Sequence, residues 1–268
     1  MKRAKERPMS MRYCIRLPIL LSCSLLAACA TSAEQAEESR LLALADDIAT
    51  QGDYGTATTL YERAAELSGE DVDIDVRLGD ARLASGDPQG ALRSYRAALE
   101  KDIDNPTALL GLGSAQLRLG KVESAERNLR LAAPTLDTSS AWSRLGAAQA
   151  LLGQGEAAVS SFSRAVAQAP DAPDPQTNLA LAHSLAGQHD AAVARMRDVA
   201  ASPLAEERHF RSLILTLVMG GDIQQAETID VPDMPASRRQ SLIEQAQRIR
   251  DLPGTGEQAR AIGLAGYE

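Results

Sequence analysis

The sequence predicts an all-α fold built from repeated helix pairs, and three observations carry that prediction. Apolar residues make up 44% of the 268 residues but aromatic residues only 3%, so the apolar content is mostly Ala and Leu. Ala and Leu are strong helix formers, whereas the β-branched and aromatic residues that favour strands are scarce. The third observation is a repeat of about 34 residues that runs through most of the chain.

Residues 1–28 have the pattern of a cleaved secretory signal. Basic residues are concentrated between Met1 and Arg16, and an uncharged run follows from Leu17 to Ala28. This run is too short to span a bilayer as a helix, which needs about 20 residues, but it suits the apolar region of a signal peptide. Because the segment is basic, the rest of the chain is more acidic than the overall net charge of −8. Such a chain repels nucleic-acid phosphates, so we expect no nucleic-acid partner.

Cys29 follows this run directly, and Leu26-Ala27-Ala28-Cys29 resembles the lipobox of bacterial lipoproteins. The resemblance implies signal cleavage between Ala28 and Cys29, a diacylglycerol on the Cys29 thiol and acylation of the new amine. The alternative is an ordinary signal peptide that ends on an incidental cysteine. Cys14 and Cys23 lie in the segment to be removed, so the mature chain would keep one cysteine and form no intramolecular disulfide.

Residues 29–37 are predicted to form a short polar tether that carries the lipid. Several acyl chains on one residue give durable anchoring, where a single chain is marginal. Ala30 and Thr31 follow Cys29, with no Asp beside it. Resemblance to the enterobacterial sorting rule then implies transport to the periplasmic face of the outer membrane.

The repeat occupies residues 38–230. Its predicted units are residues 38–71, 72–105, 106–138, 139–172, 173–206 and a degenerate 207–230. Turn glycines recur at Gly52, Gly86, Gly120, Gly153, Gly187 and Gly221. In period, turn glycine and alternation of small and large residues, the sequence resembles the tetratricopeptide repeat, and Trp142 and Pro170 stand where that motif often has Trp and Pro. The resemblance implies a solenoid, a right-handed superhelix of antiparallel helix pairs.

The residue types in each unit fit that architecture. Glycine tolerates the left-handed conformation that ends the first helix of a pair. Small residues allow close approach of helix axes at Gly79, Gly113, Gly146 and Ala180 and at Ala57, Ala91, Ala125, Ala158, Ala192 and Ala226. Large residues fill the space between units at Tyr61, Tyr95, Leu129, Phe162 and Met196. All of these are expected to be core, because one unit buries its apolar face only against its neighbours.

The remaining C-terminal residues divide into two parts. Residues 231–250 are predicted to contain a capping helix whose apolar stripe is Leu242, Ile243, Ala246 and Ile249. Residues 251–268 contain Pro253, Gly254 and Gly256 and show little periodicity, so a mobile tail is expected there.

The sequence carries no motif that predicts catalysis, a metal or a cofactor. His183, His189 and His209 lack metal-ligand spacing. The acidic run 71–75 resembles the start of a calcium loop, but Val76 and Arg82 stand where that loop needs Gly and Glu. We interpret the run as a solvated turn that caps the next helix. No enzyme activity and no cofactor are therefore expected.

A protein or peptide partner is expected instead, in a concave groove lined by the first helices of the units. Resemblance to tetratricopeptide proteins places these residues there: Asp73, Val76, Arg77, Asp80, Leu110, Ser114, Leu117, Arg118, Ser143, Arg144, Ala147, Leu151, Thr177, Asn178, Leu181 and Leu185. Their mixture of apolar, Arg and small polar types suits an extended or helical peptide. Asn178 matches one member of the carboxylate clamp of chaperone receptors, but the cooperating Lys residues are missing. For any single groove residue, plain solvent exposure is the alternative.

A lipobox followed by six repeats and a short helical C-terminus resembles TadD, the lipoprotein family of tight-adherence (Flp pilus) secretion systems. That resemblance implies a protein-binding assembly factor that helps a secretin or another pilus component assemble. Two alternatives remain open from the sequence. One is a scaffold lipoprotein that organises peptidoglycan enzymes, and the other is a hydrolase with an unrecognised site.

Overall fold

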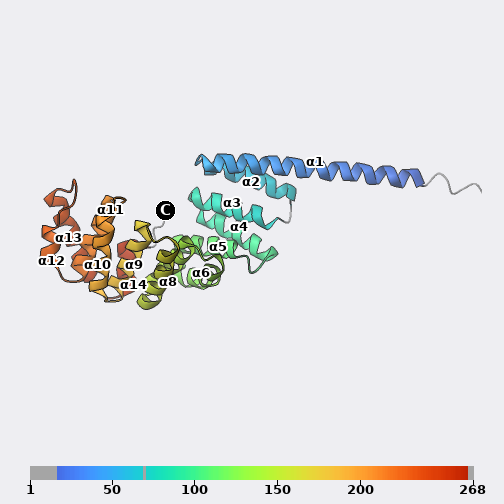
Figure 1. Cartoon of the computed structure of the whole chain (residues 1–268). Helices are drawn as coiled ribbons and strands as arrows, with labels where there is room; N and C mark the ends of the chain where they lie inside the picture. Colours follow the sequence, from blue (N-terminus) through green and yellow to red (C-terminus); the bar gives the residue numbers. More distant parts are fainter. Residues whose placement is uncertain (1–16, 69–70, 265–268) are drawn as a thin grey trace, which may run out of the picture.

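The computed structural model describes residues 17–68 and 71–264, with side chains described from residue 34 onward. Every regular element in these residues is a helix, which confirms the predicted all-α fold class (Figure 1). The helices are α1 (Leu17–Thr50), α2 (Tyr54–Ser68), α3 (Val72–Ala84), α4 (Pro88–Lys101), α5 (Pro106–Arg118), α6 (Val122–Leu136), α7 (Ser139–Leu151), α8 (Gly155–Gln168), α9 (Pro173–Leu185), α10 (His189–Ala201), α11 (Glu207–Met219), α12 (Ile223–Thr228), α13 (Ala236–Arg250) and α14 (Thr255–Ile262).

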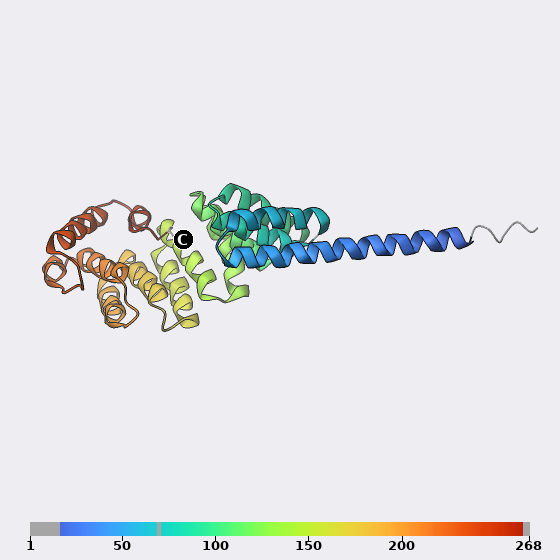
Figure 2. The ribbon, with the colours of Figure 1, turned by 90° about the horizontal axis from the view of Figure 1, so that it is seen from above.

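The helices stack in chain order. Each helix from α1 to α11 packs against the next one, with α1 and α2 forming the first pair and α11 and α12 the last. Figure 2 shows the pairs arranged along an arc, with the N-terminal part of α1 projecting beyond it. This arrangement is the solenoid that the repeat predicts, and it is stabilised mainly between neighbours.

Six glycines join the two helices of the six pairs. Gly52, Gly86, Gly120, Gly153, Gly187 and Gly221 all have positive φ, between 69° and 87°. This left-handed conformation is costly for residues with a Cβ atom and suits glycine. The structure confirms the predicted turn positions and gives their physical reason.

Small residues on the first helix of a pair face large residues on the second. A Cβ atom added to Gly146 would lie 2.9 Å from atoms of the Phe162 ring, and one added to Gly113 would lie 2.6 Å from Leu129 Cγ. Phe162 and Leu129 are fully buried. The predicted packing of small against large residues is therefore confirmed, and a larger side chain at either glycine would separate the helices.

Helix α1 is continuous from Leu17 to Thr50 and so passes through the expected cleavage site and the expected tether 29–37. Residues 1–16 and the side chain of Cys29 lie outside what the structure describes, so lipidation at Cys29 stays a prediction. Within the described part of the chain, no helix has both the length and the apolar character needed to cross a membrane.

At the C-terminal end, α13 packs on α11 through the predicted apolar stripe, in which Ile243, Ala246 and Ile249 are buried. The expectation of a mobile tail over 251–268 is wrong for residues 255–264. These residues form α14 and the turn after it, and Ala259 and Leu264 are 0% and 3% exposed. The segment is too short to show a helical period, and its order comes from contacts with distant helices.

Candidate functional site: the concave groove

The groove changes character along the array. One position on the first helix of each unit, repeated every 33 or 34 residues, is occupied in order by Asp46, Asp80, Ser114, Ala147, Leu181 and Leu215. The first two are acidic, the next two are small and the last two are aliphatic. The groove therefore has a charged half over α1, α3 and α5 and an apolar half over α7, α9 and α11.

Asp46 ties the first two units together in the charged half. Its carboxylate accepts a hydrogen bond of 2.6 Å from the hydroxyl of Tyr61 and one of 2.5 Å from Arg77 of the next unit. Burial pushes the pKa of Asp46 upward, but the hydrogen bonds from Tyr61 and Arg77 and the charge of Arg77 outweigh it, so the pKa is lowered. Arg77, an expected groove residue, is thus engaged in a contact between units.

Asp80 occupies the same place in the second unit with different partners. It accepts a hydrogen bond of 2.6 Å from the hydroxyl of Tyr95. Asp80 is exposed, but the protein around its carboxylate displaces much of the nearby water, and this desolvation raises its pKa. The hydrogen bond from Tyr95 and the charge of Arg144 offset the desolvation only in part. Burial also lowers the pKa of Arg144 despite the nearby Tyr95 and Asp80. Asp80 on α3 and Arg144 on α7 carry opposite charges and influence one another where the charged half meets the apolar half.

Arg118 completes the charged half and is exposed. Its guanidinium donates a hydrogen bond of 2.9 Å to the carbonyl of Leu83, the residue before the last of α3. This contact holds the side chain along the groove wall and leaves other donors of the guanidinium facing solvent. A planar guanidinium held in this way can bind a carboxylate of a partner with two hydrogen bonds.

The apolar half is covered by the chain's own C-terminus. Leu151, Leu181 and Leu185 are 3%, 5% and 5% exposed. Helix α14 packs on α7 and α9, and Leu264 belongs to the same buried cluster as these three leucines. Figure 2 shows the C-terminal segment returning from the far end of the arc to its middle. Part of the expected groove is therefore occupied.

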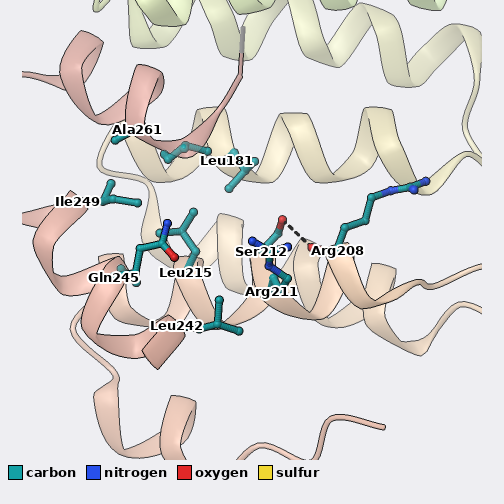
Figure 3. A pocket seen from close by; sticks show the side chains of 11 residues that line it. Leu181, Arg208, Arg211, Ser212, Leu215, Leu242, Gln245, Ile249 and Ala261 are labelled. Carbon is teal, nitrogen blue, oxygen red and sulfur yellow. Dashed lines mark hydrogen bonds between the residues drawn. The ribbon is translucent and has the colours of Figure 1, made fainter. Parts of the chain in front are cut away.

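A pocket of about 210 Å³ remains beside α14, between α9, α11 and α13 (Figure 3). Its lining residues are Leu181, Arg208, Arg211, Ser212, Leu215, Leu242, Gln245, Ala246, Ile249, Ala261 and Ile262. Aliphatic side chains form most of this wall, and Arg208 and Arg211 lie along one side. Such a pocket fits an apolar side chain with an acidic group next to it.

The expected groove residues separate by exposure. Asp73, Arg77, Asp80 and Arg118 are exposed, and Leu110, Arg144 and Asn178 are half-buried. The others, Val76, Ser114, Leu117, Ser143, Ala147, Leu151, Thr177, Leu181 and Leu185, are buried. The hydroxyls of Ser114 and Thr177 donate to main-chain carbonyls of their own helices, at 2.7 and 2.9 Å. Which of these residues bind a partner stays a prediction.

Sequence reasoning missed the groove residues of the sixth unit. Arg211, Ser212 and Leu215 lie 34 residues after Thr177, Asn178 and Leu181 and line the pocket. Continuing the repeat register by one unit would have found all three. No repeat or motif in the sequence indicates that α14 lies in the groove.

The histidine of this region has a structural role. His209 is 1% exposed; its Nδ1 accepts the N–H of Glu206 at 2.8 Å, so its Nε2–H donates to Asp174 at 3.0 Å. Burial raises the pKa of Asp174, but the hydrogen bonds from His209 and Arg208 and the charge of Arg208 outweigh it and lower the pKa. The contact joins the fifth and sixth units. No group of His, Cys, Asp and Glu suited to hold a metal ion is found among the described residues.

Solved structures of similar fold are repeat proteins. PilF of Pseudomonas aeruginosa matches with a TM-score of 0.60 and 18% identity over 72% of this chain and 88% of that one. A tetratricopeptide repeat protein of Parabacteroides merdae matches with a TM-score of 0.63 and 18% identity over 79% and 87% of the two chains. YrrB, a TPR protein described as having an unusual peptide-binding site, gives a TM-score of 0.54 and 17% identity over 70% and 92%. These likenesses show the fold.

A curated relative matches over part of the array. It is the cellulose synthase operon protein C of Xanthomonas axonopodis pv. citri (strain 306), 38% identical over 92 residues. The match covers 34% of this chain but spans only 6% of the length of the relative. It shows similarity between repeats of the two proteins.

Models of the tetratricopeptide repeat match residues 42–106, 76–141, 110–173 and 173–198. Together these matches run without a gap over more than half of the chain, across helices α1 to α10. They agree with the helix pairs, the turn glycines and the packing of small against large residues. The chain belongs to the tetratricopeptide repeat family.

Proposed function

We propose that this chain is a lipid-anchored protein-binding factor that assists assembly of a tight-adherence (Flp) type pilus or secretion system. It would be attached through Cys29 to the periplasmic face of the outer membrane and bind a secretin or another assembly component in its groove. The observation that carries the proposal is the lipobox-like sequence Leu26–Cys29 directly before an array of six repeats. A lipid anchor on a repeat array brings a partner to the membrane without any chemistry of its own.

The groove supports the binding part of the proposal. Its charged half exposes Asp80 and Arg118 beside Arg144, and its apolar half carries the aliphatic wall around Leu181 and Leu215. Charged groups favour encounter and register of a partner, whereas aliphatic contacts supply most of the affinity. Among solved proteins of this fold, YrrB is described as having a peptide-binding site. Proteins of this fold are typically scaffolds without catalytic activity, which favours a binding protein over a hydrolase.

The proposal is tested by crosslinking and affinity purification of the full-length protein from membranes, with mass spectrometry of its partners. A secretin or pilus component among the specific partners supports the assembly function. Peptidoglycan synthases or hydrolases without a secretin contradict it and favour a cell-wall scaffold. If the purified protein acts on a cell-wall substrate, and one side-chain change abolishes that activity, the protein is an enzyme instead.

Charge reversal in the groove provides the matched control. The double variant Arg118→Glu and Arg144→Glu reverses two charges on the inner face, whereas Arg93→Glu and Arg96→Glu reverse two exposed charges on α4. We expect the first pair to lose the partner and the second pair to keep it. Equal capture by both would place the binding surface outside the groove.

The anchor is tested separately by the variant Cys29→Ser. We expect this change to release the protein from the membrane fraction, because no acyl chain can be attached. Fractionation equal to that of the unchanged protein would contradict the lipoprotein assignment, even where the partner is still found.

A further inference from the structure

The apolar half of the groove holds a short amphipathic helix from the chain itself. We propose that this surface over α7 and α9 is a binding site for a helix of that chemistry, and that a partner helix replaces α14 there. The inference deepens the proposed function. It rests on one part of that function, the binding of a protein in the groove.

Three contacts place α14 in the site. Ala259 is fully buried and lies in the same cluster as Leu151 and Leu185, with Leu264 after it. Ile262 packs against the same cluster and lines the pocket with Leu181. Ala259 and Ile262, three positions apart on α14, therefore face the groove, as on one side of an amphipathic helix. Leu264 adds an aliphatic contact from the turn after the helix.

The start of α14 fits closely against the turn of the fourth unit. A Cβ atom added to Gly256 would lie 2.7 Å from the main-chain oxygen of Leu151. One added to Gly153 would lie 3.1 Å from Thr255 Oγ1. The obstacle at Gly256 is main chain and cannot rotate away. The site therefore accepts a helix only if the first turn of that helix has no side chain at the position of Gly256.

The hold on α14 is weak enough to be exchanged. The helix has eight residues, and an isolated helix of that length is not stable in water. Its side-chain hydrogen bonds run from Gln258 to the carbonyls of Arg250 and Leu252, at 3.0 and 3.2 Å, within its own end of the chain. Apolar contact therefore holds it in the groove, and a longer helix with the same apolar face would bury more surface.

The space beside α14 indicates what else the partner helix carries. The pocket of about 210 Å³ next to Ile262 and a second one of about 590 Å³ next to Leu264 lie along its free side. Arg211 lies at the edge of the first pocket and Arg208 lines both. A partner with larger aliphatic side chains would fill these spaces, and an acidic residue beside the first pocket would meet the guanidinium of Arg211. Arg208 is already paired with Asp174 and Glu206.

The test uses the full chain and a fluorescent synthetic peptide with the sequence of residues 251–264. The variant Gly256→Val should expel α14 through the clash with Leu151. The variant Gly254→Val is the matched control, because a Cβ atom there has nothing within 4 Å and the φ of −128° suits valine. Ala259→Arg expels α14 by a second route. Faster tryptic cleavage after Arg260 reports release of the helix.

We expect the peptide to bind Gly256→Val and Ala259→Arg at least tenfold more tightly than the unchanged chain or Gly254→Val. A peptide with Ala259→Asp should not bind any of them. Release of α14 without peptide binding would overturn the proposal, and so would equal binding to all four proteins or unchanged cleavage after Arg260 in both expelled variants. Partner capture in the membrane experiment is independent of these outcomes, so each proposal can fail alone.

Discussion

The hydroxyl of Tyr95 donates a hydrogen bond of 2.6 Å to the carboxylate of Asp80. Tyr61 makes the same bond to Asp46 in the preceding unit, also at 2.6 Å. The pKa of Asp80 is nevertheless raised and that of Asp46 lowered. Desolvation by the surrounding protein dominates at Asp80, whereas at Asp46 the hydrogen bonds from Tyr61 and Arg77 and the charge of Arg77 outweigh it. Asp46 and Asp80 occupy the same position of the repeat, but their contributions to folding stability change in opposite directions as the pH falls.

Replacing Asp46 by Asn should remove a stabilising contact at neutral pH. Because the folded pKa of Asp46 is lowered, its contribution is present above the usual Asp value of about 3.9 and is lost as the pH falls through the folded pKa. Its side chain is 45% exposed, so we expect a loss of about 0.2–1 kcal/mol at pH 7. Urea unfolding of the variant and the unchanged protein, at pH 7 and below pH ~4, measures this loss of stability. A loss that does not shrink in acid would contradict the assignment.

Replacing Asp80 by Asn should leave the stability at pH 7 unchanged or raise it. The folded pKa is raised, so the ionised carboxylate disfavours the folded state at neutral pH, and this penalty disappears as the pH falls to the unfolded value. The Asn oxygen still accepts the bond from Tyr95. Asp80→Ala is the control, because it leaves the tyrosine hydroxyl without its acceptor, at a cost of about 1–3 kcal/mol. Equal losses for Asn and Ala in urea unfolding would refute this explanation.

A larger side chain at Gly111 should destabilise the array. A Cβ atom there would overlap the ring of Tyr95, which is fully buried between two units. We expect Gly111→Val to cost about 1–3 kcal/mol in the free energy of unfolding, as overpacked cores do. Gly55→Ala is the control, because its Cβ atom would meet only Asp53, at 3.7 Å. Fluorescence of Trp142, the only tryptophan, follows unfolding of both variants.

Removing the two partners of Asp174 should have unequal effects. His209→Ala leaves the main-chain N–H of Glu206 and one side of Asp174 without partners, at a cost of about 1–3 kcal/mol. Arg208→Ala removes an exposed ion pair, and its cost should stay below about 1 kcal/mol. Thermal unfolding of the two variants compares them directly, and the reverse order would show that the buried histidine does not hold the fifth unit to the sixth.

The parts of the fold that repeat were predictable from the sequence, because each unit restates the same local pattern. The glycine turns and the packing of Gly146 against Phe162 are examples, and their residue types alone indicated them. The position of α14 was not predictable in this way. Ala259 and Leu264 gain their burial from α7 and α9, which lie more than seventy residues earlier in the chain, and no local period records such a contact. Arg77, Asp80 and Arg118 were expected on the groove, but Asp46 was not named, and the bond from Arg77 to Asp46 crosses a unit boundary and was missed.

The return of α14 to α7 and α9 has a consequence for how the molecule unfolds. In a solenoid with contacts only between neighbours, units can fray from either end with little effect on the middle. Here α14 bridges back to two earlier units, while among the described helices the first pair packs only against the second. We therefore expect the C-terminal units to unfold as one cooperative block and unfolding to begin at the N-terminal pair, the end next to the proposed lipid anchor.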